Sequence, residues 1–111
     1  MRKGFAQPPR TSRFDAADAT AWEAESRYWR AQYLFQPYYR LGRPYEFYAP
    51  AFRIGFETAH RESTATFDEM VDEMRRRLEH VERDRHLDWA TAEPAARAAW
   101  LRVERGRRSY A

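Results

Sequence analysis

Apolar side chains in this sequence recur every three to four residues, and no run alternates apolar and polar residues with the β-strand period of two. The helical spacing is clearest over residues 66–81, where the apolar positions are Phe67, Met70, Val71, Met74, Leu78 and Val81. This segment opens on TFDE, a capping box in which the side chains of Thr66 and Glu69 each accept from the other residue's backbone N–H. We therefore expect an all-α fold of three or four helices.

Two more helices are predicted before this one. The first begins near Asp15 or Asp18, which are good N-caps, and ends at Pro37, because a residue preceding proline is pushed out of helical space. The second begins near residues 46–48 and takes Pro50 in its first turn, where the missing N–H costs nothing. Their apolar faces carry Trp22, Trp29 and Tyr33 in the first helix, and Phe52, Phe56 and Ala59 in the second.

Glycine and proline positions shape the remaining expectations. Gly55 lies beside the apolar face of the second helix, where close approach of another helix would explain a residue that costs roughly 1 kcal/mol against alanine.

A fourth helix begins either after Asp88 as N-cap, with a kink at Pro94, or later, with Thr91 as N-cap. Gly106 is expected to end this helix. Its apolar residues are Trp89, Ala92, Ala96, Ala99, Trp100 and Val103.

The chain of 111 residues is expected to form one domain with charged ends. We divide it into a flexible basic arm (1–14), dispensable for folding, a compact helical domain (15–105) and a short basic tail (106–111). The arm carries +4 and residues 89–111 carry +3, which leaves residues 15–88 at −4 within the net charge of +3. The predicted core is Trp22, Trp29, Phe52, Phe56, Phe67, Val71, Met74, Leu78, Trp89 and Trp100.

Composition excludes several classes of protein. There is no cysteine, so neither a disulfide framework nor thiolate chemistry is available. The charged start of the sequence has no apolar run behind it, unlike a secretory signal, and no stretch approaches the roughly 18 apolar residues of a membrane helix. A cytoplasmic location without membrane contact is the simplest expectation.

Residues 33–56 hold nine of the eighteen aromatic residues of the chain. Pro37, Gly42 and Pro44 make the part from 36 to 46 a loop. The favoured interpretation is that residues 33–46 pack over the helices, with the tyrosine rings buried and their hydroxyls wet.

The same stretch has two binding interpretations if its rings are exposed. Tyrosine and arginine dominate the hot spots of protein interfaces, which favours a protein partner or a homo-oligomer. Interleaved rings and guanidinium groups can also stack bases and neutralise phosphates of RNA or a single strand, with help from the basic ends. The candidate contacts are Tyr38, Tyr39, Arg40, Arg43, Tyr45, Tyr48 and Arg53. Burial of the tyrosines would weaken both interpretations.

Glu57 and His60 form the one pair with metal-like spacing, an E-x-x-H one helical turn apart. Carboxylate-bridged di-iron bundles use such a pair twice, but here Arg77 precedes His80 and Arg83 precedes His86 at the matching distance. No serine has a nucleophile context and no glycine loop could hold phosphate. We expect no metal, no cofactor and no catalysis.

Four motifs resemble a family of small uncharacterised bacterial proteins loosely associated with stress. They are YWRAQY, RPYEFYAPAFRIG, TFDEM and LDWATAEPAARAAW, and the resemblance covers about residues 27–104. It implies no catalytic residue and no ligand, and the basic arm and the histidines depart from the family pattern. The sequence thus predicts a non-enzymatic helical interaction protein, with nucleic-acid binding as the alternative.

Overall fold

Four helices contain most of the residues that the computed structural model describes, which are 10–40, 42–81 and 87–109. They are α1 (Arg10–Gln32), α2 (Tyr45–Arg61), α3 (Val71–Val81) and α4 (Trp89–Ser109), with the 3-10 turns η1 (Tyr33–Phe35) and η2 (Asp68–Met70). None of the described residues lies in a β-strand, so the all-α prediction is confirmed.

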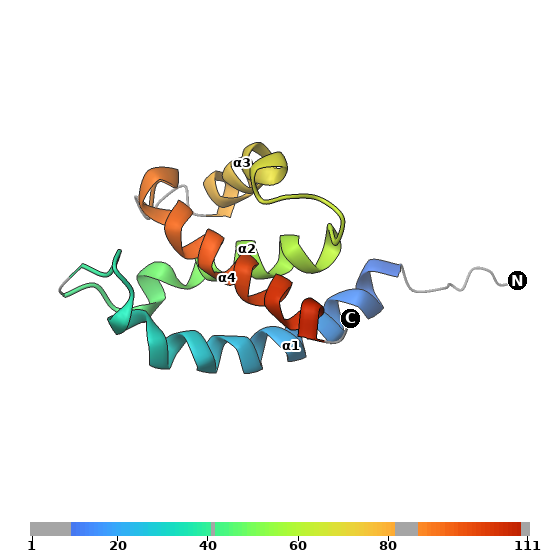
Figure 1. Cartoon of the computed structure of the whole chain (residues 1–111), viewed down its shortest axis with the longest axis horizontal. Helices are drawn as coiled ribbons and strands as arrows, with labels where there is room; N and C mark the ends of the chain where they lie inside the picture. The colour runs from blue at the N-terminus through green and yellow to red at the C-terminus, as the bar shows by residue number, and fades with distance from the viewer. Residues whose placement is uncertain (1–9, 41, 82–86, 110–111) are drawn as a thin grey trace, which may run out of the picture.

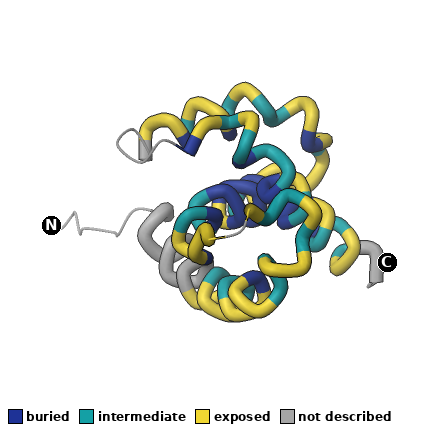
Figure 2. The backbone as a smooth tube through the Cα atoms, turned by 90° about the vertical axis from the view of Figure 1, so that its left-hand side faces the viewer, coloured by how far each residue is buried: buried dark blue, intermediate teal, exposed yellow. Residues whose placement is uncertain are grey.

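The second helix is the centre of the arrangement, because α2 packs against each of the other three helices. Figure 1 shows α4 crossing α2, with α1 running along one side of α2 and α3 lying on the other. The buried residues gather where these helices face one another, as the dark blue segments in Figure 2 show. A single hydrophobic core therefore surrounds α2.

The contact between α2 and α4 is made by small residues. A Cβ atom added at Gly55 would overlap the backbone of α4, lying 2.8 Å from the carbonyl carbon and 2.9 Å from the Cα of Ala96. The α4 residues on this side are fully buried alanines: Ala92, Ala95, Ala96 and Ala99. The expected close approach of a helix at Gly55 is thus confirmed, and it brings the two backbones together.

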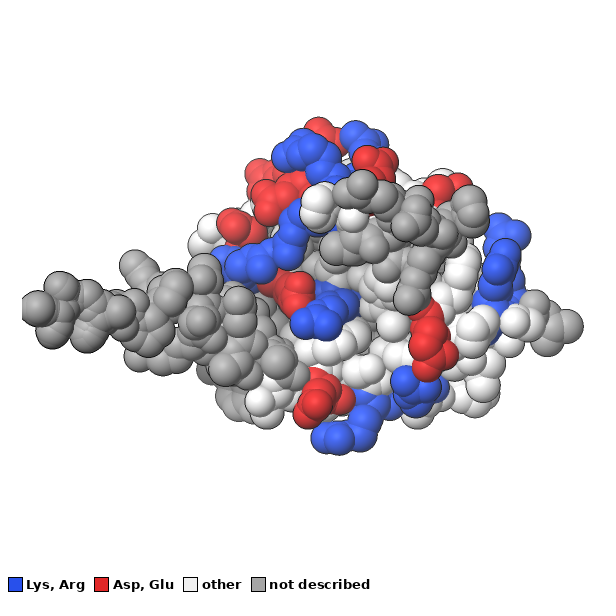
Figure 3. All heavy atoms as spheres, turned by 180° about the vertical axis from the view of Figure 1, so that it is seen from behind, with Lys and Arg blue, Asp and Glu red and all other residues white. Residues whose placement is uncertain are grey.

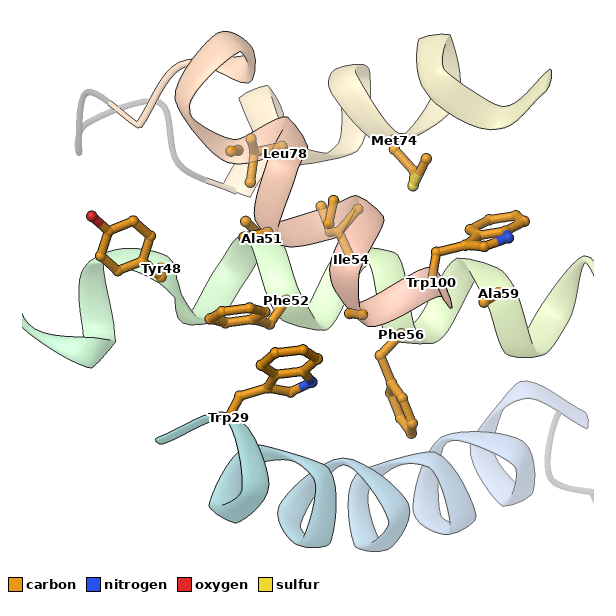
Figure 4. Close-up of a cluster of buried hydrophobic side chains, with 14 of the residues drawn as sticks. Trp29, Tyr48, Ala51, Phe52, Ile54, Phe56, Ala59, Met74, Leu78 and Trp100 are labelled. Carbon is orange, nitrogen blue, oxygen red and sulfur yellow. The ribbon is translucent and has the colours of Figure 1, made fainter. Parts of the chain in front are cut away.

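Aromatic rings fill the space between α1 and α2. Trp29 of α1 stacks on Phe52 of α2, with ring centroids 4.5 Å apart and an interplanar angle of 13°. Figure 4 shows these two side chains facing each other, while Met74 and Leu78 reach inward from α3. Of the ten predicted core residues seven are buried and none is exposed; Trp22, Val71 and Trp89 are half-buried.

Two helix starts have the predicted caps. The Glu69 N–H donates to the Thr66 hydroxyl at 3.2 Å, and the Thr66 N–H donates to the Glu69 carboxylate at 2.9 Å, so the capping box forms. It opens the 3-10 turn η2, and the α-helix α3 itself begins only at Val71. Asp88 accepts from the Thr91 N–H at 2.9 Å, so α4 begins after Asp88 and contains Pro94. The later start with Thr91 as N-cap is therefore wrong.

Other predicted boundaries are corrected. Helix α1 begins at Arg10 rather than at Asp15 or Asp18, since each residue added to a formed helix gains a hydrogen bond; residues 1–9 of the expected arm lie outside the described residues. Helix α2 begins at Tyr45, directly after the extended residue Pro44, which places Pro50 beyond its first turn.

The end of α4 also differs from the prediction. The helix runs through Gly106 to Ser109, so most of the expected tail is helical. A glycine that ends a helix usually takes a positive φ. Among the described glycines only Gly42 does so, with a φ of 90°, in the loop before α2. Gly106 keeps a helical backbone instead.

Candidate protein-binding groove

The tyrosines of the predicted contact set point into the molecule, and two of them lie in the first turn of α2. Tyr45 and Tyr48 are 3% and 0% exposed, and both hydroxyls have partners. The Tyr48 hydroxyl accepts from the Arg40 N–H at 2.8 Å, and the Tyr45 hydroxyl lies 2.9 Å from the Ser26 hydroxyl of α1. These two rings are therefore part of the core and present no face on which a base or a partner could stack.

The two tyrosines of the loop, Tyr38 and Tyr39, lie against Tyr48. Tyr38 and Tyr39 are half-buried, with ring centroids 6.1 Å and 6.3 Å from that of Tyr48. The Tyr38 hydroxyl is buried without a hydrogen-bond partner among the described residues. This burial, together with the neighbouring Tyr48, raises the pKa of Tyr38 well above its ordinary value. The loop thus packs over the helices as the favoured interpretation expected, but the expectation of wet hydroxyls is wrong for Tyr38 and Tyr48, whose hydroxyls are buried.

The three arginines of the predicted contact set point outward but do not join the tyrosines in one surface. Arg40 is exposed, and Arg43 lies over the Phe47 ring with 4.4 Å between the guanidinium carbon and the ring centroid. Arg53 lies further along α2, where it donates to Glu57 at 2.7 Å. Of the seven predicted residues, Arg53 alone lines a groove described below.

The E-x-x-H pair is also divided between two surfaces. Glu57 accepts from Arg53 and lies 3.7 Å from the Arg77 guanidinium, whereas His60 is exposed and its ring packs against Phe56 with centroids 4.6 Å apart. Across the described part of the chain, no three histidine or acidic side chains gather as metal ligands would. Glu57 therefore forms ion pairs with two arginines.

A groove of about 430 Å³ opens on α2 between α1 and α3. Its lining residues are Trp22 of α1, Arg77 of α3, and Ala49, Pro50, Arg53, Ile54 and Glu57 of α2. Its walls come from α1, α2 and α3, and no described residue of α4 lines it. Figure 3 views the molecule from behind, where positive and negative side chains meet amid uncharged surface.

Charged groups are fixed along one side of this groove. Glu57, only 16% exposed, is paired with Arg53 at 2.7 Å and with Arg77 at 3.7 Å. Arg77 also donates to the buried Thr58 hydroxyl at 3.3 Å. The Arg53 guanidinium lies 5.9 Å from the centroid of the Trp22 ring. Two guanidinium groups and one carboxylate leave the groove with an excess positive charge beside an apolar floor.

Sequence reasoning missed most of this groove. Ala49, Arg53 and Glu57 are four residues apart and form one face of α2, which is a detectable signal. Trp22 and Arg77 come from other helices, and only the packing of α1 and α3 around α2 brings them to this face. No local pattern could have connected them.

Comparison of the chain with protein-family models, with curated proteins and with solved structures finds no match. None of the helices in the described part of the chain is long and apolar enough to cross a membrane.

Proposed function

We propose that this chain is a non-enzymatic interaction protein that binds a partner protein through the groove on α2. The observation that supports the proposal most is the combination of an apolar floor with ion-paired arginines at one side of the groove. Interface hot spots commonly combine such apolar pockets with tryptophan and arginine, and here Trp22 and Arg53 lie together. A cytoplasmic location belongs to the same proposal.

The charges of the groove define the partner's chemistry. Two guanidinium groups oppose one carboxylate, so an occupant that brings a carboxylate would balance the site. The apolar residues Ala49, Pro50 and Ile54 would accept an apolar side chain of the occupant. In a helical occupant, this side chain would lie one turn away from the carboxylate. We therefore propose an amphipathic helix of another protein, with an apolar anchor flanked by an acidic residue.

Catalysis is not part of this proposal. The sequence has no cysteine, and the one carboxylate in the groove is held by two arginines rather than poised as a base. The tyrosine rings of the predicted contact set pack inward and serve the fold, so the groove on α2 is left for recognition.

A peptide titration with two arginine variants tests the proposal. The probe is a capped helical peptide of about 15 residues with leucine and aspartate on one face, and its affinity is measured by calorimetry. Arg53→Ala should weaken binding about tenfold, since a hydrogen bond to a charged group is lost.

Arg30→Ala is a matched control for this experiment. Arg30 also pairs with a glutamate, Glu46 at 3.0 Å, and also lies over a ring, that of Tyr45 at 4.6 Å, but it is outside the groove. Equal losses in both variants, or no binding of the peptide to the wild type, would contradict the proposal. If instead the molar mass of the wild type in solution rises with protein concentration, and that of Arg53→Ala stays at the monomer value, the occupant of the groove is a second copy of this chain.

A further inference from the structure

A second hollow, of about 620 Å³, lies where α1, the end of α2 and the last turns of α4 meet. The lining residues that matter here are Tyr28, Phe56, His60, Arg102, Arg105 and Arg107. Its volume is within the range of roughly 300–1,000 Å³ that small-molecule sites occupy. The proposed function does not use this hollow, and it shares no lining residue with the groove on α2.

The charge of the hollow is positive. Among the described residues that line it, three are arginines and one, Glu25, carries a carboxylate. This carboxylate is already satisfied, because it accepts from Arg102 at 2.8 Å and from the Trp29 indole N–H at 3.1 Å. With its side chain only 13% exposed, Glu25 presents little negative surface to a ligand. The hollow therefore favours an anion.

Flat groups also face this hollow. The Arg102 guanidinium lies over the Tyr28 ring, 3.5 Å from its centroid, and is held there by the bond to Glu25. His60 is exposed, with its ring supported edge-on by the buried Phe56. Arginine planes and histidine rings are surfaces on which nucleic-acid bases stack.

We infer that this hollow binds a nucleoside phosphate. The base stacks on Arg102 or His60, and the phosphate is held by Arg105 and Arg107 at the rim. Arg107 donates to the Ala59 carbonyl at the end of α2, which fixes the position of the guanidinium. A guanidinium group has five N–H donors, so the interactions that Arg105 and Arg107 already make within the fold leave donors for phosphate. Nucleotide recognition would thus come from the α4 end rather than from the tyrosine loop.

Two sources of this ligand chemistry must be separated: a free nucleotide and a nucleotide within a single strand. The probes are AMP, adenosine, inorganic phosphate and an oligodeoxyadenylate strand. Binding is followed by residue-resolved NMR, with the signals of His60, Phe56 and Arg105 as the reporters of the hollow. AMP should shift these signals, while adenosine should do so at least tenfold more weakly, because it lacks the charged group.

Substitutions at the rim locate the binding. Arg105→Gln and, separately, His60→Gln should each weaken AMP binding, by about tenfold for the arginine. Arg61→Gln is the matched control, since Arg61 is exposed beside His60 at the end of α2 but does not line the hollow. All three side chains lie at the surface, and a thermal melt confirms that each variant folds.

The outcomes decide the inference. AMP shifts that are lost in Arg105→Gln and kept in Arg61→Gln support a free nucleotide. Tighter binding of the strand at the same residues, falling steeply with salt, supports the same chemistry within a nucleic acid. Inorganic phosphate binding as well as AMP would overturn the nucleoside part, and the absence of shifts at these residues with any probe would overturn the inference.

Discussion

Tyr38 of the loop and Tyr48 of α2 differ in what their hydroxyls contact. The Tyr48 hydroxyl accepts from the Arg40 N–H at 2.8 Å, whereas the Tyr38 hydroxyl is buried without a partner among the described residues. Burying a hydroxyl without a hydrogen bond costs free energy, so the Tyr38 hydroxyl destabilises the fold whereas the Tyr48 hydroxyl does not.

Removing each hydroxyl should therefore have opposite effects on stability. Tyr38→Phe should leave the free energy of unfolding unchanged or raise it, because an unpaired buried hydroxyl is removed. Tyr48→Phe should lower it by about 1 to 2 kcal/mol, since the Arg40 N–H loses its acceptor. Urea denaturation of both variants measures this, and equal losses would show that the Tyr38 hydroxyl has a partner after all.

Alkaline pH provides a second test of the buried rings. Burial raises the pKa of Tyr38, with a smaller contribution from Tyr48, and burial is also the main cause of the raised pKa of Tyr45. The unfolded chain releases these protons near pH 10, where the folded chain still holds them. Stability is therefore full below about pH 10 and declines above it. Denaturation midpoints at rising pH measure this, and Tyr38→Phe should show a shallower decline.

At the scale of helices, the approach of α2 to α4 depends on one glycine. Gly55→Ala places a methyl group against the Ala96 backbone, which cannot move as a side chain could. The substitution should cost about 1 to 3 kcal/mol or more. Gly106→Ala is the matched control, because nothing lies within 4 Å of a Cβ atom there. It should stabilise α4 by about 0.5 to 1 kcal/mol. Thermal melts showing equal effects would contradict the close packing.

The 3-10 turn η2, which leads directly into α3, depends on a single hydroxyl. Thr66→Ala removes the acceptor of the Glu69 N–H and should lower the free energy of unfolding by about 1 kcal/mol. Thr64→Ala, at an exposed position in the turn before the box, should change it by less than about 0.5 kcal/mol. An unchanged denaturation midpoint for Thr66→Ala would show that the Thr66 hydroxyl does not stabilise this turn.

At the scale of the whole molecule, sequence periodicity predicted the core but not the surface. The apolar spacing located Trp29, Phe52 and Trp100, because burial repeats with the helical period. It could not show whether Gly106 ends α4 or lies within it, since a glycine inside a helix and a glycine that ends one look alike in sequence. The groove on α2 could not be predicted either, because Trp22 and Arg77 meet only after three helices have packed.

The four tryptophans offer the most direct test that a partner occupies this groove. Trp22 lines the groove, while the indole N–H groups of Trp29 and Trp100 are bonded to Glu25 and Glu104 within the fold. The measurement is the ¹H–¹⁵N spectrum of the indole groups during titration with the acidic amphipathic peptide. The account predicts that the Trp22 signal moves progressively while the Trp29 and Trp100 signals stay in place. A Trp22 signal that does not move at saturating peptide would contradict it.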